Sequence, residues 1–281
     1  MKNYALKDRV VAITGGTGGL GMAVAKALRA RGALIALLDL DGAVAGEKAR
    51  VLGGNDVAAG WQADVCSLGS VETAMASVAR HFGGIDVVIA GAGIGIVDSM
   101  ASIDPRLFER HIDINLNGVF RTFRAALPYV QARKGYMMAI SSMAAFVHGP
   151  LNGHYAASKA GVWALCDSVR LEVRHLGVGV GSVHPTFFKT PMMDAVQADP
   201  IGNKVWGGNE KGLWKMIELD EVVTHIVEGI ERRRDMVIVP KRNSLVAWMP
   251  GILRRVVEAV GFKQTDIVES IRLAREGKRD D

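Results

Sequence analysis

The chain has 281 residues, of which 49% are hydrophobic and 22% are charged, and its formal net charge is +5. This balance fits one large globular domain with a sizeable core, and the absence of interleaved aromatic and basic residues argues against nucleic-acid binding. Two cysteines, Cys66 and Cys166, are too few for a disulfide framework, so we expect a reducing, cytoplasmic setting. We predict neither a signal peptide nor a membrane-spanning segment.

Apolar strands and amphipathic helices alternate along residues 1–242. The strands are short and rich in Val, Ile and Ala, which favours a parallel sheet that helices cover on both faces. The carboxyl ends of such strands form the edge where ligands bind. The predicted strands are 10–14, 34–39, 57–61, 85–90, 136–141, 178–183 and 236–239, with helices near 20–31, 43–52, 69–82, 104–113, 116–133, 155–176 and 219–232.

A glycine-rich turn follows the first predicted strand and leads into a helix. It contains Gly15, Thr17, Gly18, Gly19, Leu20 and Gly21. Glycines let the backbone approach a pyrophosphate closely, and the start of the helix offers free N–H groups and a positive dipole end to that anion. Asp39 ends the second strand, 18 positions after Gly21, where an acid would accept hydrogen bonds from an adenosine ribose. This unit predicts a dinucleotide-binding site.

Tyr155 and Lys159 lie four residues apart, and Ser142 precedes the tyrosine by 13 positions. Residues at i and i+4 share one face of a helix, so the phenol and the ammonium would point into the same space. A nearby ammonium favours the phenolate and would lower the pKa of Tyr155 from its ordinary value of about 10. The pair therefore predicts a proton donor and acceptor that works near neutral pH.

Taken together, these motifs resemble the short-chain dehydrogenase/reductase family. The matching pieces are Thr14-Gly15-x-x-x-Gly19-x-Gly21, Asp64-Val65, Asn115, Ser142 and Tyr155-x-x-x-Lys159, in the family's order and spacing across about residues 8 to 191. The resemblance implies a single-domain, doubly wound Rossmann-type sheet, a nicotinamide cofactor, and interconversion of an alcohol and a carbonyl. It also implies a homo-oligomer, a dimer or a tetramer, and we take the homotetramer as the expected form.

The resemblance further implies a catalytic tetrad. Tyr155 would transfer the proton to or from the substrate oxygen, and Ser142 would hydrogen-bond the same oxygen. Lys159 would lower the tyrosine pKa and hold the nicotinamide ribose. Asn115 would anchor a water that links Lys159 to bulk solvent.

The adenosine half of the cofactor is expected at the ends of the second to fourth strands. By resemblance, Asp64 would hydrogen-bond the adenine amino group, the Val65 backbone would contact the ring, and Gly91 would let the ribose approach. The family usually has two asparagines at positions 90–91, and both are missing here. Asp39 would repel a 2′-phosphate, and the basic residues typical of NADP-preferring relatives are absent, so we predict NAD(H).

The nicotinamide half is expected beside the sixth strand. By resemblance, Pro185 shapes this loop, and the Phe187 backbone and the Thr190 hydroxyl would meet the nicotinamide carboxamide. The family typically has a glycine where this chain has Thr186. That difference would shift the local backbone.

Residues 191–218 are expected to form a mobile lid over an apolar pocket. Met and aromatic side chains suit a broad hydrophobic site, and no cluster of Arg or Lys offers itself to a phosphate or carboxylate. We therefore expect a bulky, uncharged secondary alcohol or ketone, such as a steroid, a terpenoid or an aromatic alcohol. Alternatively, several of these side chains pack the lid against the core or a partner subunit. The predicted pocket residues are Ala144, Phe146, Val147, Leu151, Phe188, Met192, Met193, Trp206 and Trp214, and no metal site is expected.

Residues 243–281 are expected to form a C-terminal extension. Its first part, 243–257, is apolar with two arginines. It would lie on a membrane surface, cover the pocket of a neighbouring subunit, or pack as an ordinary terminal helix. Residues 263–281 are polar and mixed in charge, so we expect a solvated helix or a disordered tail there.

Three function classes remain open. The leading one is an NAD(H)-dependent dehydrogenase of bulky, mainly apolar alcohols. A reductase of 3-oxoacyl thioesters resembles the same motifs, but it usually prefers NADPH and needs basic surface near the mouth of its pocket. The third is a non-catalytic NAD-sensing protein, because a fold does not by itself fix a function.

Overall fold

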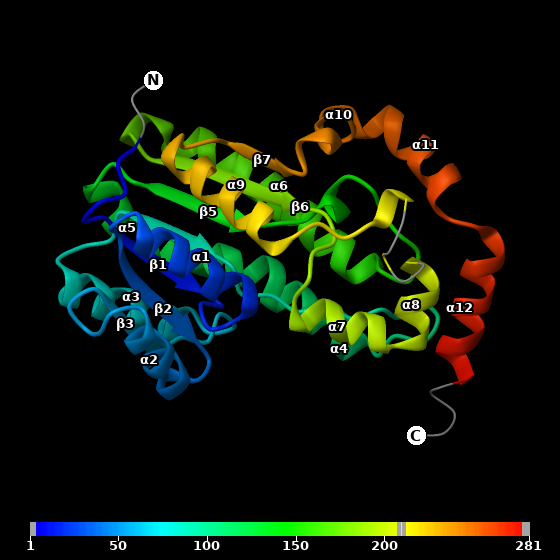
Figure 1. Cartoon of the computed structure of the whole chain (residues 1–281), viewed down its shortest axis with the longest axis horizontal. Coiled ribbons are helices and arrows are strands. Elements are labelled where there is room, and N and C mark those ends of the chain that lie inside the picture. The colour runs from blue at the N-terminus through cyan, green and yellow to red at the C-terminus, as the bar shows by residue number, and fades with distance from the viewer. Residues whose placement is uncertain (1–3, 207–208, 210–211, 277–281) are drawn as a thin grey trace.

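The computed structural model describes residues 4–206, 209 and 212–276. Its centre is a parallel sheet of seven strands in the order β3-β2-β1-β4-β5-β6-β7, with helices on both faces (Figure 1). The predicted fold class is confirmed, and each predicted strand overlaps an observed one. The strands are β1 (Val10–Thr14), β2 (Leu34–Asp39), β3 (Ala58–Gln62), β4 (Val87–Ala90), β5 (Tyr136–Ile140), β6 (Gly179–Pro185) and β7 (Met236–Val239).

The strand order reverses at β1, which pairs with β2 on one side and with β4 on the other. At such a switch point the crossover connections leave in opposite directions, and a crevice opens outside the carboxyl ends of the strands. The topology therefore places the glycine-rich turn after β1 at the centre of the binding edge.

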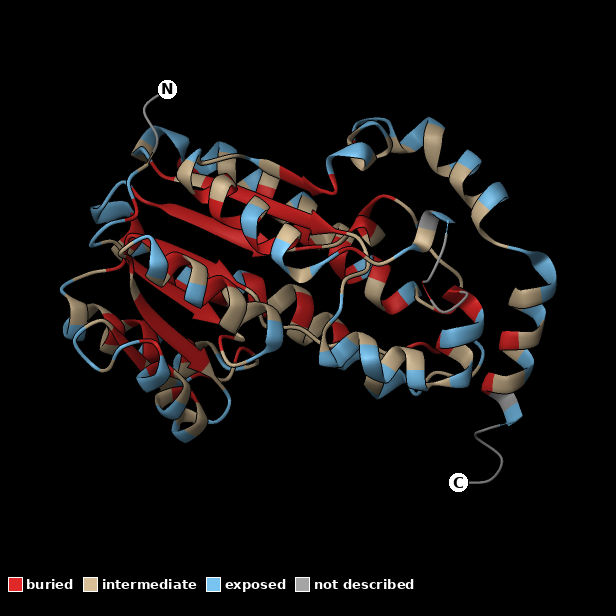
Figure 2. Cartoon of the chain, in the orientation of Figure 1, coloured by how far each residue is buried: buried red, intermediate tan, exposed pale blue. Residues whose placement is uncertain are grey.

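Side chains on β1 alternate between two hydrophobic cores. Val11 and Ile13 belong to one core, and Val10 and Ala12 belong to the other. This alternation follows from the two-residue period of a strand, and most strand residues are buried (Figure 2). The first core lies under α1 (Gly19–Ala30), α2 (Gly42–Val51) and α9 (Leu219–Glu231), and the second under α3 (Leu68–Phe82), α5 (Gly118–Ala132) and α6 (Gly153–Val173).

Side-chain caps start several of the helices. Asp41 accepts hydrogen bonds from two N–H groups of α2. The Ser67 side chain accepts one hydrogen bond from an N–H group of α3. Asp104 caps α4 (Pro105–Ile112), which continues through a π-helical turn, η1 (Asp113–Asn117), into α5. Such caps satisfy N–H groups that a helix leaves unpaired.

The lid consists of α7 (Pro191–Ala198), α8 (Pro200–Trp206) and the short turn η5 (Gly212–Trp214). A bridge between Phe188 and Ile217 closes its base. Parts of the predicted lid, residues 207–208 and 210–211, lie outside the described residues.

The C-terminal extension forms α10 (Ser244–Trp248), α11 (Pro250–Gly261) and α12 (Gln264–Glu276), which curve around the end of the molecule that carries the lid (Figure 1). The helix expected as one alternative for the tail is present as α12, but it is not simply solvated, because it packs against α8 and buries Ser270 and Ala274. Residues 277–281 lie outside the described part of the chain.

Candidate active site

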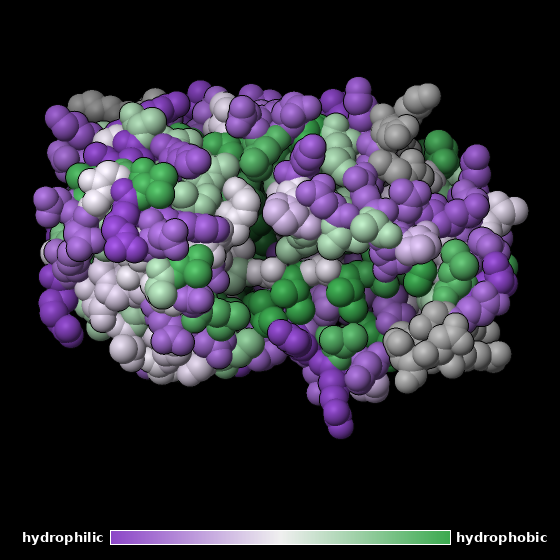
Figure 3. Space-filling model, turned by 60° about the horizontal axis from the view of Figure 1, so that its bottom comes forward, coloured by the Kyte–Doolittle hydropathy of each residue, from purple (hydrophilic) through white to green (hydrophobic). Residues whose placement is uncertain are grey.

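A cavity of about 770 Å³ lies at the carboxyl edge of the sheet, between the glycine-rich turn and the lid. Figure 3 shows that the molecule is hollowed on this face, with apolar residues gathered around the opening. Every residue predicted to bind the cofactor lines it: Gly15, Thr17, Gly18, Gly19, Leu20, Gly21, Asp39, Asp64, Val65, Gly91, Tyr155, Lys159, Pro185, Phe187 and Thr190.

The glycine-rich turn has no room for side chains at two positions. Gly15 has a φ of +68°, and a Cβ there would lie 2.8 Å from the backbone of Ala92. A Cβ on Gly21 would lie 2.4 Å from the Gly15 carbonyl oxygen. The N-cap residue of α1 is Gly18, which offers no side-chain acceptor, so the first N–H groups of the helix lie at the cavity without a side-chain cap. This cradle fits the pyrophosphate of a dinucleotide.

Asp39 lies in the cavity and holds the turn in place. Its Oδ2 accepts hydrogen bonds from the Thr17 amide at 3.0 Å and the Thr17 hydroxyl at 2.6 Å. Its Oδ1 accepts one from the Leu40 amide at 2.9 Å. The carboxylate keeps lone pairs for further donors, and its charge at the end of β2 fits ribose hydroxyls better than a phosphate.

Gly91 replaces one of the two asparagines that the family usually has. Its amide donates to both the carbonyl oxygen (3.1 Å) and the hydroxyl oxygen (3.2 Å) of Thr14, which joins β4 to β1. A Cβ at this position would lie 2.9 Å from the Thr14 carbonyl oxygen. An asparagine side chain at this position would therefore require the backbone to shift.

Ser142 and Tyr155 meet at the centre of the cavity. The Ser142 oxygen accepts a hydrogen bond from the Ala144 amide at 3.1 Å, which leaves its own hydrogen free to donate. Burial raises the pKa of Tyr155, and the hydrogen bond with Ser142 lowers it. Ser141, the neighbour most easily confused with Ser142, is buried and donates to the Lys159 carbonyl oxygen at 2.9 Å.

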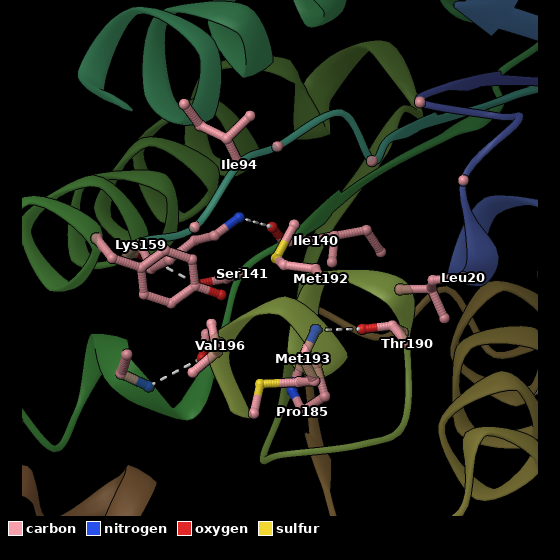
Figure 4. A pocket seen from close by; sticks show the side chains of 18 of the residues that line it. Leu20, Ile94, Ile140, Ser141, Lys159, Pro185, Thr190, Met192, Met193 and Val196 are labelled. Atoms are coloured by element: carbon pink, nitrogen blue, oxygen red, sulfur yellow. Dashed lines mark hydrogen bonds between the residues drawn. The ribbon is translucent and has the colours of Figure 1, made fainter. Parts of the chain in front are cut away.

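Lys159 lies on α6 one turn after the tyrosine, with its amine 5.5 Å from the centre of the Tyr155 ring. The amine donates to the Ile140 carbonyl oxygen at 2.9 Å (Figure 4). Burial lowers the pKa of Lys159 to about 8. The expected lowering of the tyrosine pKa by this ammonium is not seen: burial dominates and raises the pKa, and Ser142 is the group that opposes it.

Asn115 is buried beneath the cavity and does not line it. Its Oδ1 accepts from the Ile94 amide at 2.8 Å, and its Nδ2 donates to the Ile94 carbonyl oxygen at 3.0 Å. The π-helical turn η1 carries this side chain, and such turns are frequent at functional sites. In this structure Asn115 fixes the loop after β4, next to Lys159, and its predicted water-anchoring role stays a prediction.

His184 contacts Ser142, the predicted catalytic serine, from behind, and the sequence analysis did not identify this contact. Its Nδ1 lies 3.2 Å from the Ser142 carbonyl oxygen and its Nε2 lies 2.8 Å from the Ser182 hydroxyl. Because a carbonyl only accepts, Nδ1 carries the proton and Nε2 accepts from Ser182. Burial lowers the pKa of His184 to about 4, so this histidine is neutral at physiological pH.

We predict that His184 makes the fold acid-sensitive. The unfolded chain protonates this side chain below about pH 6.5, and the folded chain resists protonation down to about pH 4. The free energy of unfolding should therefore fall as the pH drops through this window, by up to about 3 kcal/mol from this group. Denaturant unfolding of His184→Gln should show a flatter pH dependence. The exposed His148→Gln is the control, and equal slopes in all three proteins would contradict the assignment.

The loop after β6, where the nicotinamide is predicted to bind, is held by hydrogen bonds to α7 and β7. Thr190 caps α7, accepting from the Met193 amide at 3.3 Å, and its hydroxyl hydrogen remains free to donate (Figure 4). The Thr186 amide donates to the Val239 carbonyl oxygen at 2.9 Å, so the residue in place of the usual glycine is tied to β7. Pro185 and Phe187 flank it in the cavity wall.

Four aromatic rings close the far end of the cavity. Phe187 lies 4.9 Å from Trp206, and Trp206 meets Trp214 edge to face at 5.5 Å. Phe262 stacks on Trp214 with ring centres 4.9 Å apart. The Trp214 indole N–H donates to the Gly261 carbonyl oxygen at 2.9 Å. The lid and the C-terminal extension of the same chain therefore build one wall.

Two of the predicted pocket residues do not line the cavity. Phe146 is buried in a separate cluster, between Trp163 at 4.7 Å and His184 at 4.6 Å. Leu151 packs behind the wall, in the same cluster as Trp206. The other predicted residues do line it: Ala144, Val147, Phe188, Met192, Met193, Trp206 and Trp214.

The sequence missed several residues of the cavity wall. Arg110 of α4 lines it, and among the described lining residues Arg110 and Lys159 are the only cations. Apolar residues of the loop after β4 and of the extension complete the wall: Ile94, Ile96, Val97, Val246, Val257 and Phe262. Hydrophobic periodicity within a segment cannot predict these contacts, because they join segments far apart in the sequence. Among the described residues no group of His, Cys, Asp or Glu could bind a metal ion.

Comparisons with known proteins agree with this geometry. A family model described as short chain dehydrogenase matches residues 9–201. The chain is 32% identical over 195 residues to the D-beta-hydroxybutyrate dehydrogenase of Rhizobium meliloti, covering 66% of this chain and 74% of that protein. It is 31% identical over 205 residues to the 3-hydroxyacyl-CoA dehydrogenase type-2 of Homo sapiens, covering 68% and 78%. The crystal structure of gox2181 is similar with a TM-score of 0.73 and 29% identity, over 80% of this chain and 89% of that one.

Proposed function

Because the chain belongs to the short-chain dehydrogenase family, whose members are oxidoreductases that act on CH–OH groups, we propose that it interconverts a bulky, mainly apolar secondary alcohol and its carbonyl form with NAD(H). The observation that carries this proposal is the position of the Tyr155–Ser142 pair. It lies where the glycine cradle and the apolar end of the cavity meet. A reacting carbon there can face a cofactor on one side and proton-transferring groups on the other.

A bound nicotinamide dinucleotide would supply or accept the hydride. Tyr155 gives its phenolic proton to the carbonyl oxygen in reduction and takes the hydroxyl proton in oxidation. Ser142 donates its free hydrogen to the same oxygen, which holds that oxygen within reach of the phenol. The amine of Lys159 lies between the tyrosine ring and the end of β5. From there it would hold the nicotinamide ribose, and it would favour the phenolate once Tyr155 has given up its proton.

The preference for NAD(H) is supported by Asp39. Its carboxylate stands at the end of β2 in the cavity, where the adenosine ribose of a dinucleotide would lie above the glycine turn. A 2′-phosphate would bring a second negative charge against it. The free cysteines Cys66 and Cys166 support a reducing, cytoplasmic setting.

An apolar substrate is supported by the aromatic wall. Methionine and aromatic side chains can adapt to a large ring system while excluding water. On α7, Met192, Met193 and Val196 lie across from Lys159 (Figure 4). Planar or polycyclic alcohols would therefore fit better than short polar ones.

The test is a substrate panel with purified protein. We would follow the reduced cofactor by absorbance with steroids, terpenols, aryl carbinols and 3-oxoacyl thioesters, each with NAD(H) and NADP(H). Turnover of neutral bulky alcohols with NAD(H) supports the proposal.

The second candidate is a reductase of 3-oxoacyl thioesters. Arg110 in the cavity wall favours it, because this arginine could pair with an anionic carrier. Preferred turnover of thioesters with NADPH would replace the first proposal with the second.

We predict that Phe262 sets the preference for ring-shaped substrates. Phe262→Ala removes the ring that stacks on Trp214, and aromatic contacts of this kind contribute about 0.5–1.5 kcal/mol beyond their buried area. The KM for polycyclic or aryl alcohols should rise about tenfold, while a short aliphatic alcohol keeps its kcat/KM. Phe82→Ala removes a comparable ring contact, with Trp61, outside the cavity and is the matched control. An equal loss for short and polycyclic alcohols would argue against a specificity role.

A further inference from the structure

The outer face of α10 and α11 carries a continuous row of exposed apolar side chains. Trp248 is 69% exposed, Ile252 64% and Val260 73%. Ile252, Val256 and Val260 follow one another at intervals of four residues, which puts them on one side of α11, and Trp248 is exposed at the end of α10. Folded proteins seldom leave such a row in water without a partner. The row, called the apolar stripe below, consists of Leu245, Trp248, Met249, Ile252, Val256 and Val260.

The opposite side of the same segment already has its own contacts. Val246, Val257 and Phe262 line the cavity, and Ala247 is buried. The inner side of the segment therefore faces the cavity, its end at Gly261 and Phe262 contacts the lid through Trp214, and the apolar stripe lies on the exposed side.

Positive charge accompanies the stripe. Residues 241–263 contain five basic residues and one acidic residue, a surplus of four, against a net charge of +5 for the whole chain. The acidic residue, Glu258, lies 3.8 Å from Arg254, so its charge is already offset. Lys241, Arg242 and Arg255 are exposed beside the stripe.

We propose that α10 and α11 dock this protein on an anionic lipid surface, with the apolar stripe in the interfacial layer and the basic side chains on the headgroups. An apolar helix face flanked by Lys and Arg, with a Trp, is the pattern of a helix that lies in a membrane interface. Within the described residues no helix is long and apolar enough to cross a membrane, so the contact is peripheral. This inference concerns the outer face alone and does not depend on the substrate.

A second copy of the chain is the other partner that could cover the stripe. A two-fold interface would place the same patch against itself. That arrangement would place a surplus of four positive charges on one copy opposite the same surplus on the other. At such short separations physiological salt does not fully screen charges, so the two copies would repel each other. Charge complementarity therefore favours anionic lipid over a second copy.

The test is co-sedimentation of the full chain with vesicles of phosphatidylcholine alone and of phosphatidylcholine with phosphatidylglycerol. We expect binding to the anionic vesicles, which weakens as salt is raised. The double variant Ile252→Glu with Val256→Glu should lose at least tenfold of this binding. The matched control, Val51→Glu with Leu171→Glu, alters exposed apolar residues on α2 and α6 and should bind like the unmodified chain. Thermal unfolding confirms that each variant is folded.

Two results would overturn the proposal. One is that the unmodified chain stays in the supernatant with anionic vesicles at low salt. The other is that the Ile252→Glu, Val256→Glu variant keeps its vesicle binding while light scattering shows a smaller oligomer, which would assign the stripe to an interface between copies. A third variant, Arg242→Gln with Arg255→Gln, should lower binding to anionic vesicles and leave the oligomer unchanged. Its failure to do so would equally exclude the headgroup contact.

Discussion

Replacing Tyr155 with phenylalanine should lower kcat by about a thousandfold, because general acid–base catalysis by one positioned group typically contributes 10²- to 10⁴-fold. The substitution removes one oxygen atom from a buried ring and leaves its packing unchanged. Binding of the reduced dinucleotide should be retained, since the glycine cradle and Asp39 do not depend on the phenol. Stopped-flow turnover and fluorescence titration of the reduced dinucleotide measure the two effects separately.

The control for this variant is Tyr129→Phe, which removes a phenol on α5 outside the cavity. It should keep its kcat. If Tyr155→Phe retains a near-normal kcat, the proton must come from another group, and the tetrad would be misassigned. If it loses dinucleotide binding as well as turnover, the effect is structural and says nothing about proton transfer.

Neutralising Asp39 should shift the cofactor preference toward NADPH. Asp39→Asn removes the charge and keeps one oxygen that can accept from Thr17, so the turn should hold its shape. The ratio of kcat/KM for NADPH to that for NADH should rise roughly tenfold to a hundredfold. This range corresponds to removing the repulsion between the Asp39 carboxylate and the 2′-phosphate, which near the surface is a few kcal/mol at most.

The matched control for Asp39 is Asp56→Asn, which neutralises an exposed acid outside the cavity. Its cofactor preference should equal that of the unmodified chain. A shift of the same size in both variants would attribute the effect to net charge. An unmodified chain that already uses NADPH as well as NADH would refute the argument from Asp39 before any substitution is made.

The fold and the cofactor edge were predictable because their signals are local. A buried strand such as 10–14 can be recognised from its composition. After it, Gly15, Gly16 and Gly21 are required because a Cβ there would lie less than 3 Å from backbone atoms. Tyr155 and Lys159 share a helix face, so their proximity follows from spacing alone. For these features a few consecutive residues carry enough information.

The remaining features depend on contacts between distant segments. The sequence places Lys159 near Tyr155, but it cannot show that burial raises the tyrosine pKa and that Ser142 is the group that opposes this rise. The same limit applies to Phe146, which packs on His184 rather than on a substrate. Phe262, 48 residues beyond Trp214, completes the cavity wall only because α12 seats on α8. The hydrophobic periodicity of one segment alone cannot predict a contact of this kind between two distant segments.

The seating of α12 on α8 has a practical consequence for handling this protein. The two ends of the described chain lie far apart, with Tyr4 at the opposite end of the molecule from α12 (Figure 1). The helix α12 supports the lid through the Lys204–Asp266 ion pair at 3.7 Å and the buried Ala274. An affinity tag or fluorescent fusion joined after α12 would disturb these contacts. A tag placed ahead of Tyr4 would leave the lid undisturbed, and kinetic constants from the two kinds of fusion should not be pooled.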